Sequence, residues 1–324
     1  MFRMRLVLCT VASAIFLQAP SLAQDFPTRP ITILVPYAPG GATDQVVRLT
    51  SDVASKLLGQ PIVVENRPGG GGQIAASAVK NSPPDGYTLL LGDISTLSIN
   101  PAAYTKLNYD PVTDFEPVTE LVKIPHVLLV SVSSPFKSVD DLITAARSRP
   151  RGISYASTGT GTGAHLLGEM LGSSGNLQLV HVPYKGGAVI VPDLIAARVD
   201  FYFGAIPSAA PLVKEQKLRA LVVTDAQPAP LLPGIPIAKQ AGFPDLELTL
   251  WLGFLAPANT PQPVIAKLHQ AFSTALSSPE LVARLAAIGA NVASSASPND
   301  FKKFIKSETD RLRPVVHAAG IKIN

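Results

Sequence analysis

Residues 35–44, VPYAPGGATD, join an apolar run to a helical pattern through a Pro-Gly-Gly turn. The run before the turn, ITILVPY (31–37), predicts a buried strand. After the turn, apolar residues recur at helical spacing until Gly59, namely Val46, Leu49, Val53 and Leu57. Strand, glycine turn and helix in this order form one unit of an α/β fold.

The same unit recurs along the chain. A second glycine-rich loop, NRPGGGG (66–72), follows the strand-like run PIVV, and a third, STGTGTG (157–163), follows ISYA. Further strand-like runs are YTLLLG, HVLLVSV, LQLVHV, DFYFG and LRALVVT, and helical patterns include SVDDLITAAR and AHLLGEML. This alternation predicts an α/β protein whose sheets are largely parallel.

The order of these patterns predicts two lobes around a hinged cleft. We expect residues 24–120 to form the first part of lobe 1 and residues 121–220 to form lobe 2. Residues 221–324 are expected to return to lobe 1 and to supply the C-terminal helices. Such a return makes two chain crossings between the lobes, which is the layout of a hinged cleft protein.

Residues 1–23 have the pattern of a signal peptide. A basic start, MFRMR, precedes the apolar run LVLCTVASAIFL, and small residues at Ser21 and Ala23 fit a cleavage site. A membrane anchor is the weaker interpretation, because this run is too short to span a bilayer comfortably. Cleavage after Ala23 leaves 324 − 23 = 301 residues in the periplasm and removes Cys9, the only cysteine. The mature chain would then have no disulfide and no thiol chemistry.

The charge of the chain excludes some classes of partner. Loss of Arg3 and Arg5 with the signal peptide gives the mature chain a net charge of 25 − 23 = +2, without a block of Lys or Arg. Nucleic acid is therefore not an expected partner. No other apolar run is long enough to cross a bilayer, so we expect a soluble exported protein.

The glycine-rich loops predict an anion site. Ligands of open parallel sheets bind beyond the carboxyl ends of the strands, and a helix N-terminus presents unpaired N–H groups to an anion. We assign this role to loops 39–41 and 158–163, one in each expected lobe, and interpret 69–72 as a turn beside the cleft. Asp44 is expected to cap its helix rather than to contact the anion. For each loop, a tight turn without a ligand remains the alternative.

The residues favour a carboxylate over a nucleotide. The chain contains no Gly-Lys pair, so it has no Walker motif, and Gly159 to Gly163 do not fit the dinucleotide fingerprint GxGxxG. Metal and cofactor sites are not expected either, because the five histidines form no HxxxH pair. Organic acids remain the best candidate ligands.

Seven segments together resemble one family. VPYAPGGATD, VVENRPGGGG, PPDGYTLLLG, YASTGTGTGAHLLGE, HVPYKGG, LRALVVT and WLGFLAP stand in the order and spacing of the Bug-type proteins. These are the extracytoplasmic substrate-binding proteins of tripartite tricarboxylate transporters. The resemblance implies a two-lobed periplasmic-binding-protein fold (type II-like) and an organic-acid ligand. It also implies membrane permease subunits as partners, and we expect a monomer without catalytic residues.

The resemblance also implies a ligand site. Loop 35–41 would hold one carboxylate by its main chain, partly through ordered waters, and loop 157–163 would hold the other end of the ligand. The residues assigned in this way are Tyr37, Ala38, Gly40, Gly41, Thr158, Gly159, Thr160, Gly161 and His165. Ser95, Thr96 and Ala205 are added from two segments expected to face the cleft, 92–97 and 204–208. His165 could equally be a structural residue at the start of its helix.

The nature of the acid can be narrowed further. Members of the family often carry an acidic residue where this chain has Gly204-Ala205, and the only acid in the segments expected to face the cleft is Asp93. A buried ammonium group needs an acidic or carbonyl partner. We therefore expect a carboxylate without an α-amino group, either a small dicarboxylate or an aromatic acid.

Two other functions stay open. An exported hydrolase is the runner-up among enzymes, but the chain has no GxSxG motif and no cysteine after processing. A sensor subunit that presents its closed form to a signalling receptor would need the same cleft, so the sequence does not separate it from a transport protein.

Overall fold

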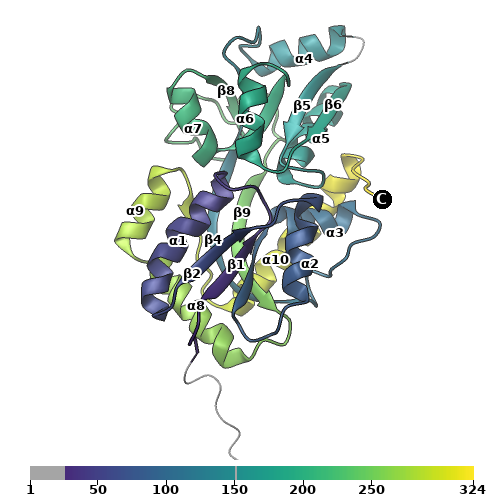
Figure 1. Cartoon of the computed structure of the whole chain (residues 1–324). Coiled ribbons are helices and arrows are strands. Elements are labelled where there is room, and N and C mark those ends of the chain that lie inside the picture. The colour runs from purple at the N-terminus through teal and green to yellow at the C-terminus, as the bar shows by residue number, and fades with distance from the viewer. Residues whose placement is uncertain (1–25, 150–151) are drawn as a thin grey trace, which may run out of the picture.

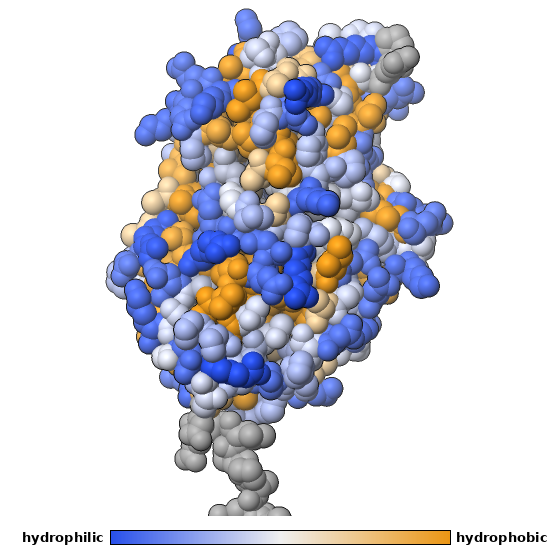
Figure 2. Space-filling view, viewed as in Figure 1, coloured by the Kyte–Doolittle hydropathy of each residue, from blue (hydrophilic) through white to orange (hydrophobic). Residues whose placement is uncertain are grey.

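The computed structural model describes residues 26–149 and 152–324, so the expected signal peptide lies outside the described residues. Two lobes are stacked along the long axis of the molecule, with strand β4 (Phe115–Ser131) passing between them (Figure 1). No helix in the described residues is both long and apolar enough to cross a bilayer. On the face seen in Figure 2, side chains of the two lobes meet across the waist of the molecule.

The first lobe is built on a mixed sheet whose strand order is β2-β1-β3-β9-β4. Its parallel strands are β1 (Ile31–Val35), β2 (Ile62–Asn66) and β3 (Thr88–Asp93), and β9 (Thr249–Pro257) lies antiparallel between β3 and β4. The short strand β10 (Asn291–Val292) pairs with β4. The helices of this lobe are α1 (Ala42–Leu58), α2 (Gln73–Lys80), α3 (Asn100–Ala103), α8 (Gln262–Leu276), α9 (Pro279–Ala287) and α10 (Pro298–Ala318). A single 3-10 turn, Gly70–Gly72, precedes α2, and a π-helical turn, Ser95–Ile99, follows β3.

The second lobe continues from the far end of β4 in the order β4-β7-β5-β6, and β8 also pairs with β4. Strands β5 (Ile153–Ser157), β6 (Leu179–Pro183) and β7 (Phe201–Ala205) are parallel, whereas β8 (Leu218–Val223) is antiparallel to β4. Its helices are α4 (Val139–Ser148), α5 (Gly163–Gly175), α6 (Gly187–Ile195) and α7 (Ile206–Lys214). The predicted α/β fold is therefore confirmed. The sheets are mixed rather than largely parallel as predicted, because β4 and β9, which lie where the lobes join, run antiparallel to their neighbours.

The chain crosses between the lobes twice in extended conformation. Residues 115–125 of β4 pair with β9 in the first lobe, and residues 126–129 pair with β7 in the second. The N–H of Thr224 donates to the carbonyl of His126, and the N–H of Leu248 donates to the carbonyl of Thr224, both at 2.9 Å. The first crossing therefore lies within β4, whereas the irregular segment 224–248 separates β8 from β9 before the second.

The expected lobe boundaries at 120/121 and 220/221 consequently fall inside β4 and β8. The structure continues the second lobe through β8, and the chain re-enters the first sheet with β9, at Thr249. The exact division of the chain into lobes stays a prediction. Trp251 in β9 is a core residue with 1% of its surface exposed, and its Nε1 donates to Oε2 of Glu308 at 3.2 Å.

Three aromatic rings stack in the second lobe beneath the third glycine-rich loop. The ring centroids of His165 and His181 lie 4.0 Å apart, and Tyr155 stacks on His181 at 5.0 Å. Nδ1 of His165 accepts a hydrogen bond from the N–H of Gly161 at 3.1 Å, and Nε2 of His181 lies 2.6 Å from Oγ of Ser157. The two imidazoles therefore support the loop from behind.

Both imidazoles are neutral at neutral pH. Burial lowers the pKa of His165 to about 3, with the charge of His181 as a second cause. Burial likewise lowers the pKa of His181 to about 4. An unfolded histidine has a pKa of about 6.5, so the folded and unfolded chains bind different numbers of protons in mild acid.

We predict that the protein loses stability as the pH falls from about 6.5 toward about 4. In this window both histidines become protonated in the unfolded chain but stay neutral in the folded chain. Proton binding therefore lowers the free energy of the unfolded state only, and the free energy of unfolding decreases. Each histidine should contribute at most about 1.4 kcal/mol per pH unit to the loss. Chemical denaturation at a series of pH values measures the slope.

The matched control replaces both histidines, as His165→Phe with His181→Phe. This variant keeps aromatic rings in the stack but has no proton-binding nitrogen at either position. Its unfolding free energy should start lower at neutral pH, because two hydrogen bonds are lost, and should then fall less steeply in acid. Equal slopes in the two proteins would contradict the prediction.

Candidate functional site

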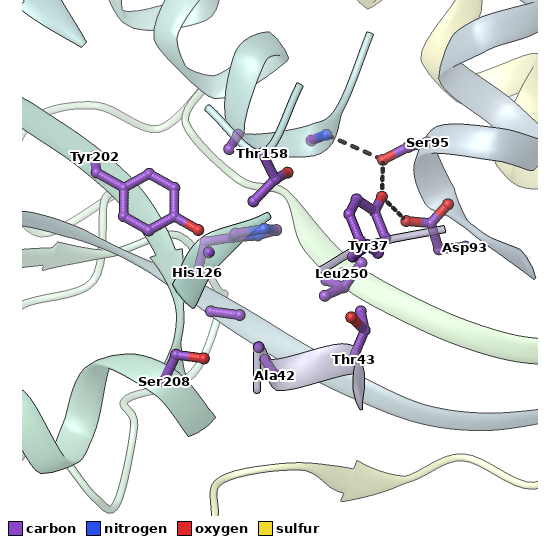
Figure 3. Close-up of a pocket in the computed structure, with 15 residues that line it drawn as sticks. Tyr37, Ala42, Thr43, Asp93, Ser95, His126, Thr158, Tyr202, Ser208 and Leu250 are labelled. Carbon is purple, nitrogen blue, oxygen red and sulfur yellow. Dashed lines mark hydrogen bonds between the residues drawn. The ribbon is translucent and has the colours of Figure 1, made fainter. Parts of the chain in front are cut away.

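A cavity lies between the lobes where four helices begin. It encloses about 500 Å³ of empty space, part of it open to solvent. The start of α1 contributes Gly41, Ala42 and Thr43, and the start of α5 contributes Gly163 and Ala164. Gly187 comes from the start of α6, and Ala205 and Ser208 come from the start of α7. The remaining lining residues are Tyr37, Asp93, Ser95, His126, Thr158, Tyr202 and Leu250 (Figure 3).

The fold brings these helix starts together because each follows a strand of a parallel set. Tyr37 and Gly41 follow β1, Thr158 follows β5, Gly187 follows β6, and Ala205 ends β7. In parallel sheets the carboxyl ends of the strands lie at one edge, which is where ligands bind. The two edges face each other across the cavity, and the central strand β4 carries His126 between them.

None of the four helices is capped by the side chain of its own N-cap residue. These N-cap residues are Gly41, Thr162, Gly186 and Ala205. By contrast, serine side chains cap α4, α9 and α10, which begin away from the cavity. Helices α2 and α8 also begin without a side-chain cap, so one uncapped helix start does not by itself indicate a binding site. The indication of a site is that four such helix starts meet at one cavity.

The cavity has a positive electrostatic character without a formal cation. No Lys or Arg is among its described lining residues, and Asp93 is their only acid. Each helix N-terminus carries about half a positive charge on N–H groups that lack an intrahelical acceptor. One of these groups is used within the protein, since the N–H of Gly163 donates to Oγ of Ser95 at 3.2 Å across the lobes (Figure 3). The arrangement as a whole favours an anion.

Tyr37 and Asp93 form a buried pair at one end of the cavity. The hydroxyl of Tyr37 donates to Oδ2 of Asp93, while Oδ1 accepts from the N–H and Oγ1 of Thr96 at 2.8 and 2.9 Å. Burial raises the pKa of Tyr37 well above its usual value and raises that of Asp93 as well. Both carboxylate oxygens of Asp93 are thus already paired with groups of the first lobe.

The sequence-based site residues divide into two groups. Tyr37, Gly41, Ser95, Thr158 and Ala205 line the cavity. The other expected residues do not, and these are Ala38, Gly40, Thr96, Gly159, Thr160, Gly161 and His165. As site residues, both groups remain predictions.

The residues outside the lining make contacts within the protein. The N–H of Gly40 donates to Oδ2 of Asp44 at 3.0 Å, so Asp44 binds the residue before the N-cap Gly41 rather than the first turn of α1. The N–H of Ala38 donates to the carbonyl of Lys185 in the second lobe at 3.0 Å. The Gly161 N–H is held by His165, so this histidine supports the loop rather than reaching the cavity.

Two glycine-rich loops meet across the lobes. The hydroxyl of Tyr104 in the first lobe donates to the carbonyl of Thr160 at 3.3 Å. A Cβ at Gly71 would lie 2.3 Å from that same carbonyl oxygen, and a Cβ at Gly161 would lie 2.6 Å from Oδ1 of Asn100. Side chains at these positions would hold the lobes apart. These two loops therefore contribute to the contact between the lobes. For loop 69–72 the sequence predicted only a turn beside the cleft, not a contact with the opposite lobe.

Several lining residues were missed by sequence reasoning. Ala42, Thr43 and Ala164 could have been found by extending each predicted loop into the first turn of its helix. Gly163 belongs to the predicted loop 158–163 and Ser208 to the segment 204–208, but neither was singled out. Gly187 ends the family-like segment HVPYKGG and was not assigned to the site. His126, Tyr202 and Leu250 belong to strands and carry no local motif, so only the assembled fold brings them to the cavity.

The chain matches the family described as tripartite tricarboxylate transporter family receptor (TctC) over residues 46–321. A UPF0065 protein from the tcbD-tcbE intergenic region of Pseudomonas sp. (strain P51) is 38% identical over 292 residues, covering 90% of this chain and 86% of the relative. Protein BugT of Bordetella pertussis (strain Tohama I) is 32% identical over 306 residues, covering 94% of each chain.

Solved structures agree with these matches. Rpa4515 of Rhodopseudomonas palustris, solved with adipate, has a TM-score of 0.88 at 36% identity and covers 92% of this chain and 99% of its own. MatC of the same species, solved with bound malate, has a TM-score of 0.86 at 34% identity and covers 90% of this chain and 100% of its own. The Bug-type resemblance and the periplasmic-binding-protein fold are confirmed, and this chain belongs to the tripartite tricarboxylate transporter receptor family of periplasmic solute-binding proteins.

Proposed function

We propose that this protein captures a small organic acid, a dicarboxylate or an aromatic carboxylate, in the cavity between its lobes. It then delivers the acid to the membrane permease subunits of a tripartite tricarboxylate transporter, after removal of its signal peptide and export to the periplasm. The observation that carries this proposal is the convergence of four uncapped helix N-termini on a cavity whose described lining has no Lys or Arg. Malate in MatC and adipate in Rpa4515 are acids of the same class.

The arrangement suits a carboxylate for two physical reasons. Backbone N–H groups at a helix start donate to an anion in a fixed direction, and the helix dipole adds to the attraction. A closed cavity excludes water, so each of these interactions is stronger than it would be at the surface. Helix starts from both lobes around one cavity would let a ligand with two acidic ends join the lobes.

We infer that the protein binds its ligand without converting it. In the cavity, the recorded partner of His126 is a backbone carbonyl, and Ser95 bonds to Tyr37 and Gly163, so neither forms a serine-histidine pair. A close serine-histidine contact does exist between Ser157 and His181. Ser157 is completely buried and lies outside the cavity lining, which leaves a substrate no access to it.

A melting screen tests the ligand class. A ligand at a hundred times its dissociation constant should add about 2.7 kcal/mol to the stability of the folded protein. We expect melting temperatures to rise with aliphatic dicarboxylates or aromatic acids and to stay unchanged with neutral sugars. Shifts confined to the sugars would refute the carboxylate proposal.

Calorimetry tests the expected rejection of α-amino acids. Both oxygens of Asp93 are occupied by Tyr37 and Thr96, so no described lining carboxylate is free to receive an ammonium group. Succinate should therefore bind at least about tenfold more tightly than aspartate, and glutarate more tightly than glutamate. Tighter binding of the amino acids would show that Asp93 exchanges its partners, and Asp93→Asn should then remove the preference.

A matched pair of glycine variants tests closure. Gly70 and Gly71 both have φ of +59°, so alanine is equally strained at either position. A Cβ at Gly71 meets the Thr160 carbonyl oxygen across the lobes at 2.3 Å. A Cβ at Gly70 instead meets Gln73 Cβ at 3.4 Å and Ile74 Cγ1 at 4.0 Å, both in its own lobe. Gly71→Ala should weaken binding by about tenfold or more, and Gly70→Ala by less than about threefold. Equal losses would mean that this contact does not limit closure.

Solution scattering provides an independent check on the motion. A ligand held by both lobes can be bound fully only when they approach each other. The radius of gyration should therefore be smaller at ligand saturation than without ligand, and Gly71→Ala should show a smaller difference than Gly70→Ala. An unchanged radius in the parent protein would mean that the lobes are already closed before the ligand binds.

A further inference from the structure

His126 is the one described lining residue of the cavity that could acquire a positive charge. It lies on β4 where the chain passes between the lobes, opposite Ala205 of β7 in register, and only 6% of its surface is exposed. Figure 3 shows its imidazole in the middle of the view, with Tyr202 on one side and Tyr37 on the other. Any ligand that fills the cavity must therefore lie close to this ring.

The surroundings of the ring decide which nitrogen carries a proton. Nδ1 lies 3.4 Å from the carbonyl oxygen of Leu248, and a carbonyl only accepts hydrogen bonds. In the neutral ring the proton therefore belongs on Nδ1, which leaves a lone pair on Nε2. No hydrogen bond to Nε2 is present in the part of the chain that the structure describes. Gly163 at the start of α5 borders this nitrogen, since a Cβ there would lie 3.8 Å from it.

A neutral His126 opposes the ligand that the rest of the cavity attracts. A lone pair on Nε2 repels a carboxylate oxygen, whereas a proton on Nε2 would donate to it. The other titratable groups that line the cavity are Tyr37, Asp93 and Tyr202, which become neutral or negative but never positive. Asp225, next to the Thr224 that bonds to His126, is a further acid near the crossing.

We propose, on the basis of the function proposed above, that the cavity takes up a dicarboxylate dianion together with one proton, shared between Nε2 of His126 and a ligand carboxylate. The proton comes from the buffered solvent, and no covalent bond of the ligand is made or broken. The charge that enters the closed cavity falls from −2 to −1. Binding of such a dianion without the proton would place two negative charges among partial helix charges alone, where desolvation is unfavourable.

The proposal fixes the direction of the pH dependence. Burial lowers the pKa of His126 to about 4 in the absence of ligand, so the ring is neutral at neutral pH. A carboxylate beside Nε2 favours the protonated ring and raises this pKa. At pH values between the pKa of His126 in the free protein and its pKa in the complex, the affinity for the dianion should increase up to about tenfold for each unit that the pH falls.

Isothermal titration calorimetry with succinate and adipate tests this directly. Titrations at about pH 7.5 in buffers of different ionisation enthalpy give the number of protons taken up, because the buffer supplies them with its own heat. At this pH both acids are dianions in solution, so any proton uptake belongs to the complex. We expect measurable proton uptake with each dicarboxylate that is larger at about pH 6.5 than at about pH 8.5, and tighter binding at the lower pH.

Two variants assign the proton to a residue. His126→Gln keeps a polar side chain but has no titratable nitrogen, so proton uptake should vanish and the affinity should become nearly independent of pH. His269→Gln is the matched control, because its Nδ1 also faces a backbone carbonyl, that of Val118 at 2.9 Å, but the residue lies on α8 outside the cavity lining. This control should keep the proton uptake of the parent protein.

Each outcome separates this inference from the proposed function. Binding of dicarboxylates by the parent protein without proton uptake overturns the inference, and leaves the proposed function in place. Uptake that persists in His126→Gln overturns the assignment to His126. Failure of every carboxylate to bind the parent protein overturns the proposed function itself. The parent measurement decides the first point even if His126→Gln does not fold.

Discussion

The constraint behind this structure is that backbone N–H groups at a helix start need an acceptor. Helices α4, α9 and α10 supply this acceptor from a serine side chain, at Ser138, Ser278 and Ser297. The four helices that begin at the cavity have Gly41, Thr162, Gly186 and Ala205 at the same position, and none of these supplies a cap to the first turn. Their N–H groups can be satisfied only by water, by the opposite lobe or by a ligand. Under the proposed function, these N-cap residues leave the first N–H groups open to the ligand.

Other small residues let the lobes approach each other. Ala38 bonds to Lys185 across the waist, and Gly71 lies against Thr160, where a side chain would overlap the carbonyl oxygen. A closed cavity needs close backbone contact around its rim, and only residues without bulk allow it. The glycines of these loops therefore allow both positive-φ turns and close contact between the lobes. Under the proposed function they also leave the backbone open to a ligand.

The sequence predicted what local patterns determine and missed what the assembled fold determines. Strand, glycine turn and helix follow from spacing, so the loops that carry Tyr37, Gly41 and Thr158 could be placed at the carboxyl ends of strands. The use of the N–H groups within a loop was predicted only in part, because a capping role was expected for Asp44 but the bond from Gly161 to His165 was not. His126 and Leu250 were beyond prediction, since they reach the cavity only through the pairing of β4 and β9 between the lobes.

A cavity that attracts its ligand mainly through backbone groups leaves discrimination to few side chains. Every residue offers the same N–H group, so the helix starts favour negative charge and a suitable length without distinguishing one acid from another. We infer that selectivity depends on the side chains that project from the strands, above all His126, Tyr202 and Leu250. These residues set the width and polarity of the middle of the cavity, and His126 also sets its charge through its protonation state. Relatives with the same fold can then bind different acids by changing strand residues alone, without altering the loops on which closure depends.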